Sequence, residues 1–134
     1  MQLPILEWRF VVAVTLLMAS FSVSADTRVA QVWTCMLNEG KTVEDLNTLH
    51  GKWLAWTNKQ TYGGDIQGSI AVPMVSDRLD VVLIIDSYPD RATYAADSDA
   101  VFDTPEGQAL IAEYVAMAAC TSNVVYSVTT SGSG

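Results

Sequence analysis

The 134-residue sequence has one histidine, two cysteines and few basic residues. Seven lysines and arginines stand against fifteen aspartates and glutamates, which gives a formal net charge of −8. A surface of this sign repels phosphate groups, which argues against nucleic acid and anionic membranes as partners. One histidine with two cysteines also does not supply the usual ligands of a zinc site, so no metal site is predicted.

The sequence also lacks the short motifs that mark several enzyme classes. It contains no GxSxG elbow, no glycine-rich phosphate loop and no CxxC pair. These motifs place a nucleophile, a nucleotide phosphate or a redox thiol pair in a defined backbone setting. Their absence means that nothing in the sequence indicates ATP or NAD binding, and no cofactor is expected.

No apolar run reaches the ~20 residues that a membrane-spanning helix needs. The apolar run at residues 10–19 (FVVAVTLLMA) is followed by small residues at Val23 and Ala25. A short lead, an apolar core and a small-residue cleavage site form the pattern of a signal peptide. We therefore expect residues 1–25 to be removed before Asp26 and the mature protein to be secreted or periplasmic, free of the membrane. A retained anchor is the alternative.

The remainder of the chain has room for one domain, residues 26–129, followed by a flexible tail at residues 130–134. Both cysteines, Cys35 and Cys120, lie in this domain. In an oxidising compartment the natural interpretation is one intramolecular disulfide. It would close a loop of about 85 residues and stabilise the fold by about 4 kcal/mol in the chain-entropy model. Two separate buried thiols are the alternative.

The pattern of apolar residues predicts four strands and two helices. The first helix begins at Thr42, where Asp45 completes an acidic capping box. A second helix starts after Thr104, with Pro105 at its first position, and residues 97–103 separate it from a short helical turn. Pro73 marks an edge strand, since proline cannot donate to a sheet. The strands are expected at residues 28–37, 69–75, 79–85 and 123–129.

The order strand, helix, strand, strand, broken helix, strand is that of a ferredoxin-like α+β domain, β-α-β-β-α-β. In this topology the first and third strands are central. Two helices cover only one face of the sheet, yet both central strands are apolar on both faces, as Val81 to Ile85 illustrates. A second copy of the chain is the economical cover for the other face.

The sequence resembles the dimeric α/β-barrel superfamily, which includes the antibiotic-biosynthesis-monooxygenase-like domains. The resemblance spans residues 28–129. It rests on the element order, the domain size, the broken second helix (ATYAADSDAVFDTPEGQALIAEYV) and the doubly apolar central strands. It implies a homodimer with a ligand pocket between sheet and helices. For an enzyme it implies cofactor-free monooxygenase or isomerase chemistry.

His50 is the candidate catalytic residue, because histidine exchanges protons near neutral pH. It lies on the apolar stripe of the first helix. A half-buried structural histidine is the alternative interpretation. Trp33, Trp53 and Tyr94 are candidate ligand-binding residues, since aromatic side chains line pockets for flat apolar molecules. They are equally suited to ordinary core packing.

The leading hypothesis is therefore an exported domain that binds a small apolar or aromatic molecule and, if it is an enzyme, converts it. The alternative is a non-catalytic exported module that acts through its surface. An acidic cluster at Asp97, Asp99 and Asp103 raises calcium as a further possibility. The cluster lacks the glycine and terminal glutamate of an EF-hand loop, so helix capping and solvation explain it better.

Overall fold

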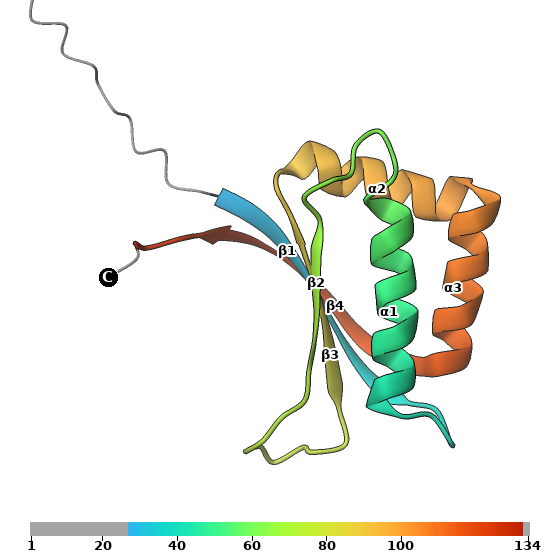
Figure 1. The fold of residues 1–134 in the computed structure, drawn as a ribbon. Helices are drawn as coiled ribbons and strands as arrows, with labels where there is room; N and C mark the ends of the chain where they lie inside the picture. The colour runs from blue at the N-terminus through green and yellow to red at the C-terminus, as the bar shows by residue number, and fades with distance from the viewer. Residues whose placement is uncertain (1–26, 133–134) are drawn as a thin grey trace, which may run out of the picture.

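The computed structural model describes residues 27–132, so the predicted signal peptide, residues 1–25, lies outside the described residues. Four strands and three helices follow one another along the chain (Figure 1). The elements are β1 (Thr27–Leu37), α1 (Val43–Thr57), β2 (Gln67–Ala71), β3 (Val82–Tyr88), α2 (Arg91–Asp103), α3 (Pro105–Met117) and β4 (Ala118–Thr129). Within the described range no helix is long and apolar enough to cross a bilayer.

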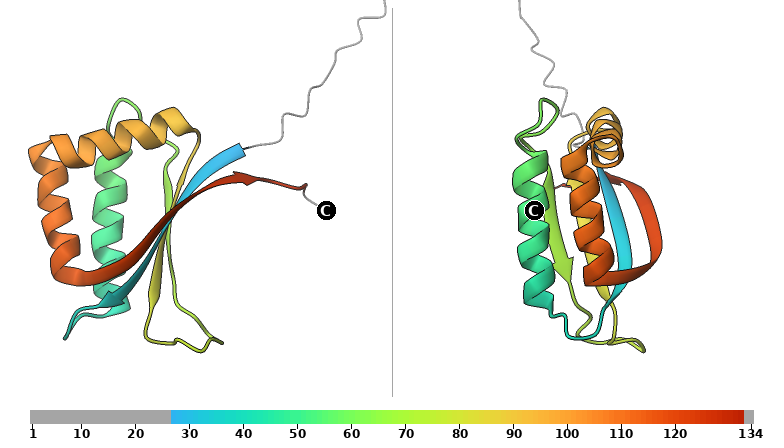
Figure 2. Two further views of the ribbon diagram at one scale, coloured as in Figure 1. Left: turned by 180° about the vertical axis from the view of Figure 1, so that it is seen from behind. Right: turned by 90° about the vertical axis from the view of Figure 1, so that its right-hand side faces the viewer.

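The strands form one antiparallel sheet in the order β2-β3-β1-β4. β1 and β3 are central and β2 is an edge strand, so the ferredoxin-like α+β prediction is confirmed. All three helices lie on one face of this sheet, with α1 and α3 side by side and α2 crossing near one end (Figures 1 and 2). The core lies between this helical layer and the sheet.

Local sequence explains where the helices begin. The Thr42 side chain accepts a hydrogen bond from the Asp45 amide and the Asp45 carboxylate accepts one from the Thr42 amide, as the predicted capping box requires. The Thr104 side chain caps α3 by accepting a hydrogen bond from the Gly107 amide, with Pro105 at the first position. The predicted break at residues 97–103 is wrong, because α2 continues without interruption to Asp103. The chain bends only at Thr104, where proline disfavours helical backbone in the residue before it.

Two strand predictions have the correct place in the sheet but shifted bounds. β3 begins at Val82 and continues to Tyr88, whereas the apolar run predicted its end at Ile85. β2 ends at Ala71, so Pro73 lies beyond the edge strand instead of inside it. The β3 extension places Asp86 within the sheet, where its 5 % exposed side chain shares the helix-covered face with Ile84 and Tyr88.

None of the helices in the described residues lies over the other face of the sheet. Val32 pairs with Ile85 on one side and with Val124 on the other, and Ala30 pairs with Tyr126. Paired residues in an antiparallel sheet point to the same face. Val124 is 40 % exposed and Tyr126 is 49 % exposed. We call this apolar surface, with Leu83 and Val128 as further members, the open face.

The predicted disulfide is confirmed. Cys35 and Cys120 face each other across β1 and β4, with a Cα separation of 3.9 Å. The pairing register shifts between Thr34 and Cys35, because Thr34 pairs with Ser122 while Cys35 pairs with Cys120. One residue of β4 is therefore unpaired at this point, which is a β-bulge.

Candidate functional site

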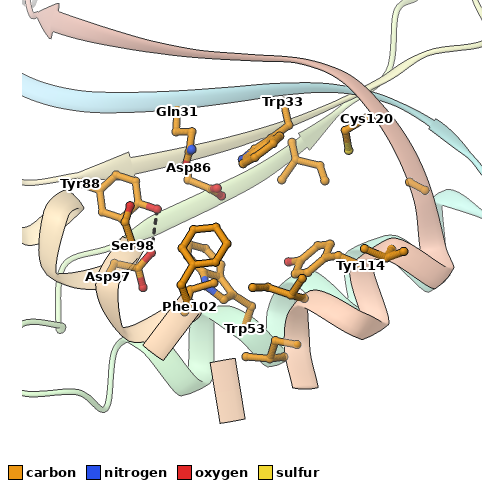
Figure 3. A pocket seen from close by; sticks show the side chains of 16 residues that line it. Gln31, Trp33, Trp53, Asp86, Tyr88, Asp97, Ser98, Phe102, Tyr114 and Cys120 are labelled. Atoms are coloured by element: carbon orange, nitrogen blue, oxygen red, sulfur yellow. Dashed lines mark hydrogen bonds between the residues drawn. The ribbon is translucent and has the colours of Figure 1, made fainter. Parts of the chain in front are cut away.

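A cavity of about 420 Å³ lies between the sheet and the helices (Figure 3). Its floor comes from the central strands, and α1, α2 and α3 form its walls. Such a volume suits a small organic molecule. The lining residues are Gln31, Trp33, Trp53, Ile84, Asp86, Tyr88, Asp97, Ser98, Val101, Phe102, Leu110, Ile111, Tyr114, Val115, Ala118 and Cys120.

The polar side chains gather toward one end of this cavity. Figure 3 shows Asp86, Tyr88 and Asp97 near one another, with Trp33 and Tyr114 farther along the wall. Phe102 and Trp53 lie opposite the sheet in the same view. The cavity is therefore mostly apolar and aromatic, with a few polar groups that could fix the orientation of a ligand.

His50 lies behind this wall and does not itself line the cavity. Its side chain is almost fully buried and stacks on Trp53, with ring centroids 5.2 Å apart. Nδ1 is 2.8 Å from the Tyr114 hydroxyl, and Nε2 is 3.2 Å from Asp86 Oδ1. His50 thus connects two side chains that do line the cavity, Asp86 and Tyr114.

Asp86 is a buried carboxylate whose closest charged neighbour is this histidine. Nε2 of His50 and Oδ1 of Asp86 are within ion-pair distance, but their orientation is not that of a hydrogen bond, and both atoms are buried without one. Burial raises the pKa of the Asp86 carboxyl, and the nearby His50 opposes this effect. The close contact allows a small rotation of the imidazole ring to complete a hydrogen bond.

Asp97 is buried in a different way, because hydroxyl groups surround it. Thr57 and Tyr62 donate hydrogen bonds to Oδ1, and Tyr88 donates one to Oδ2 at 3.0 Å. Burial still raises the pKa of the Asp97 carboxyl, although these donors oppose the rise. The network satisfies a carboxylate at the polar end of the cavity and holds Tyr88 in place.

The chain Asp86, His50, Tyr114 can move a proton. When the imidazole carries its proton on Nε2, the Tyr114 hydroxyl donates to Nδ1, and Nε2–H faces Asp86. This is the logic of a nucleophile or acid oriented by a histidine that a carboxylate supports. Burial and the negative charge of Asp86 raise the pKa of the Tyr114 hydroxyl, so a free tyrosinate is disfavoured. Tyr114 would therefore take a proton from a ligand only as it passes its own to His50.

Gly68 on β2 is needed for this arrangement. A Cβ built at Gly68 would lie 2.2 Å from His50 Nε2. Only a residue without a side chain lets the edge strand approach the imidazole so closely. The sequence therefore positions His50 from two sides, by the α1 stripe and by the bare backbone of β2.

The sequence-predicted site residues fall in different places. Trp33 and Trp53 line the cavity, and His50 contacts it through its neighbours. Tyr94 instead borders a smaller hollow beside Arg91 and β4, and its ring packs edge-on against Tyr88. The catalytic role of His50 and the ligand-binding roles of the three aromatic residues stay predictions.

Sequence reasoning missed the buried acidic side chains and the contact between Tyr114 and His50. The predicted strand 79–85 stops one residue before Asp86 because the apolar run ends at Ile85. Alternation of Val82, Ile84, Asp86 and Tyr88 on one face of the strand is the signal that could have extended it. Asp97 was grouped with Asp99 and Asp103 as a solvated cluster, whereas it is 3 % exposed. In the described residues no group of histidine, cysteine, aspartate or glutamate side chains is arranged to hold a metal ion.

No protein-family model and no curated protein matches this chain. Solved structures do resemble it. A variant of SnoaB, a cofactor-independent oxygenase from Streptomyces nogalater, is 12 % identical with a TM-score of 0.56, over 78 % of this chain and 94 % of that one. A protein of unknown function from Bacteroides thetaiotaomicron, described as a possible oxidoreductase, is 16 % identical with a TM-score of 0.53, over 78 % and 100 %.

A conserved protein from Methanosarcina mazei is also similar, at 10 % identity and a TM-score of 0.54 over 75 % of this chain and 92 % of that one. At such identities the similarity concerns the fold and carries no residue roles. The strand order, the helical layer and these neighbours agree with one another. The chain therefore has a ferredoxin-like α+β fold, which it shares with these solved structures.

Proposed function

We propose that this protein binds a small, largely apolar aromatic molecule in the cavity between sheet and helices, and converts it by proton transfer. The observation that carries the proposal is the Asp86, His50, Tyr114 chain at the wall of an aromatic cavity. A buried chain of three ionisable groups is costly to fold, so proteins keep such chains mostly where chemistry uses them.

In this mechanism Tyr114 is the group that meets the ligand. A proton leaves an acidic C–H or O–H of the bound molecule for the Tyr114 oxygen while the Tyr114 proton moves to His50 Nδ1. Asp86 then stabilises the imidazolium that forms. His50 acts through Tyr114 and is a positioning residue for it. Deprotonation of this kind is the first step of an isomerisation and needs no cofactor.

The similarity to SnoaB supports this proposal, since that protein is described as a cofactor-independent oxygenase. The disulfide supports export of the protein. A signal peptide over residues 1–25 would deliver the chain to a compartment where Cys35 and Cys120 can form their bond. We propose secretion or periplasmic residence on this basis.

The open face supports a homodimer. Its apolar residues lie on two central strands and one edge strand, and no other element of residues 27–132 covers them. A contiguous exposed apolar surface of this kind marks an interface in soluble proteins. A second copy facing it would complete the sandwich that one helical layer leaves half open.

Calorimetric titration with a neutral aromatic probe, 2-(2-naphthyl)ethanol, tests the proposed cavity site. We expect the mature protein to bind it and the Val101→Trp variant, which fills the cavity, to lose binding. Val125→Trp is the matched control, because Val125 does not line this cavity. Equal binding by all three proteins would place the probe elsewhere and contradict the site. No probe binding, together with no co-purifying small molecule in native mass spectrometry, would contradict the function.

A further inference from the structure

The charged groups that line the cavity are all of one sign. Asp86 and Asp97 are the ionisable acids in its wall, and no lysine or arginine is among the described residues that line it. The chain as a whole is acidic, with a net charge of −8. An anionic ligand would meet repulsion here without a compensating cation, since charges interact strongly in a poorly solvated cavity.

The two carboxylates are satisfied to different degrees. Asp97 receives three hydroxyl hydrogen bonds. Asp86 is 5 % exposed, lines the cavity and, apart from its contact with His50, has no partner in the described residues. A buried carboxylate without enough donors is costly, and buried charges are normally paired. Oδ1 of Asp86 faces His50, which can donate to it after a small ring rotation. Among the described residues Oδ2 has no hydrogen-bond donor, so a ligand in this cavity could supply one.

The remaining wall offers a second kind of attraction. Aromatic rings line the cavity from β1, β3 and all three helices, and they are Trp33, Trp53, Tyr88, Phe102 and Tyr114. The face of an aromatic ring attracts a cation, most strongly where water is excluded. Carboxylates among aromatic rings form a suitable binding site for an organic ammonium group.

We propose that the ligand of this cavity is an organic cation, an aromatic molecule that carries a protonated amine. The ammonium group lies at the polar end and donates to Asp86, and the aromatic part packs between Trp33, Trp53 and Phe102. This inference rests on the proposed function, because it specifies the ligand class of the same cavity. It leaves Tyr114, farther along the wall, free to meet the reacting part of the molecule.

Three probes that share a naphthylethyl group test the charge of the ligand by calorimetric titration of the mature protein. They are 2-(2-naphthyl)ethylamine, 2-(2-naphthyl)ethanol and 3-(2-naphthyl)propionate, which are a cation, a neutral molecule and an anion at pH 7.5. We expect the amine to bind at least about tenfold more tightly than the alcohol, as one charge-assisted hydrogen bond allows. The propionate should bind more weakly than the alcohol.

Asp86→Asn should remove the preference for the amine and leave the affinity for the alcohol within about threefold, since the amide keeps the shape without the charge. Asp99→Asn is the matched control, because Asp99 is exposed on α2 and does not line the cavity. It removes the same net charge and should keep the preference.

The outcomes separate this inference from the proposed function. If the alcohol binds as tightly as the amine, the cation inference is overturned, while the cavity remains a ligand site. If the amine does not bind at all, the cation inference is also overturned, and the alcohol titration decides the function. If Asp99→Asn weakens amine binding as much as Asp86→Asn does, the preference comes from net charge and Asp86 is not its source.

Discussion

Tyr114 links the cavity to the buried His50, because its side chain lines the cavity and its hydroxyl contacts the imidazole. A tyrosine at this position can pass a proton between a ligand in the cavity and an imidazole that does not contact the ligand. The direction of this hydrogen bond is tied to which nitrogen of His50 carries its proton. When Tyr114 donates to Nδ1, the proton belongs on Nε2, toward Asp86.

Tyr114→Phe should release this constraint. We expect the variant to fold with a loss of stability of about 1 kcal/mol, the usual value of one buried hydrogen bond. The ¹⁵N resonances of the single histidine should shift toward a mixture of the two tautomers. Tyr126→Phe, which removes a hydroxyl from the open face, is the control and should leave the His50 spectrum unchanged. Identical His50 spectra in all three proteins would show that Tyr114 does not set the tautomer.

At the scale of single residues, residue type and the apolar stripe of the first helix were enough to name His50, Trp33 and Trp53 as candidate site residues. It did not reveal Asp86. A carboxylate ends most apolar runs because its burial is unfavourable, so the pattern alone indicates a strand end. The compensating contact, an imidazole from a helix more than thirty positions earlier, is a tertiary feature that no local pattern contains.

The close approach of β2 to α1 is a feature of elements. It depends on Gly68, whose neighbour across the interface is His50. The Asn58 side chain at the end of α1 fixes the same connection, because it hydrogen-bonds the backbone of Gly64 and Ile66 just before β2. The edge strand is thereby held against the helix that carries the histidine.

Gly68→Ala should destabilise the protein by about 1–3 kcal/mol, the usual effect of an added methyl group in a filled interior. Chemical denaturation followed by tryptophan fluorescence measures it. Gly51→Ala is the matched control, because a Cβ at this α1 position meets nothing within 4 Å. Alanine there should stabilise the helix by about 0.5–1 kcal/mol. Equal effects of the two substitutions would contradict the close packing of β2 on His50.

Elements were predicted better than their ends. The capping residues Thr42 and Thr104 are confirmed, because caps are read from local hydrogen-bonding chemistry. The break predicted within α2 was wrong. Asp97, Asp99 and Asp103 are poor helix formers when each is considered singly, so local propensity favours a break there. Burial of Asp97 among three hydroxyl groups reverses that preference, and this network becomes visible only when α1, β3 and α2 meet.

At the scale of the whole molecule, the open face is the apolar face of the sheet that the helices of the single chain leave exposed. Val124 and Val125 are neighbours on β4 with similar exposure, 40 % and 45 %, but they point to opposite faces. Val124 pairs with Val32 on the open face, and Val125 pairs with Gln31 on the helix side. The pair therefore separates the surface that we propose for assembly from the helix side of β4, where Val125 borders the smaller hollow.

Val124→Glu should convert the proposed dimer to a monomer, because two carboxylates would be buried in a symmetric interface. Val125→Glu should leave the dimer intact. Native mass spectrometry and light scattering measure the mass of each. A monomeric wild-type protein would contradict the dimer, and dissociation by both variants would show that the open face is not the specific contact.

The fold class and the disulfide were predictable for the whole molecule, because element order restricts topology to few choices and the paired strands bring Cys35 to Cys120. The cavity was predictable only as an expectation of the superfamily resemblance. Its polar end depends on which side chains of β3 and α2 happen to meet, and composition says nothing about that.

The position of β1 in the sheet affects how the chain can fold as it is synthesised. β1 is made first, yet its two neighbours in the sheet are β3 and β4, and β4 contains the last described strand residues. During synthesis one edge of β1 can pair only after β3 has been made, and the other edge only after β4 has been made. Pairings of such long sequence separation form slowly. A chain that stops before Ala118 would lack both the second neighbour of β1 and the partner of Cys35, so a premature terminus would leave β1 open to aggregation and not yield a smaller working domain.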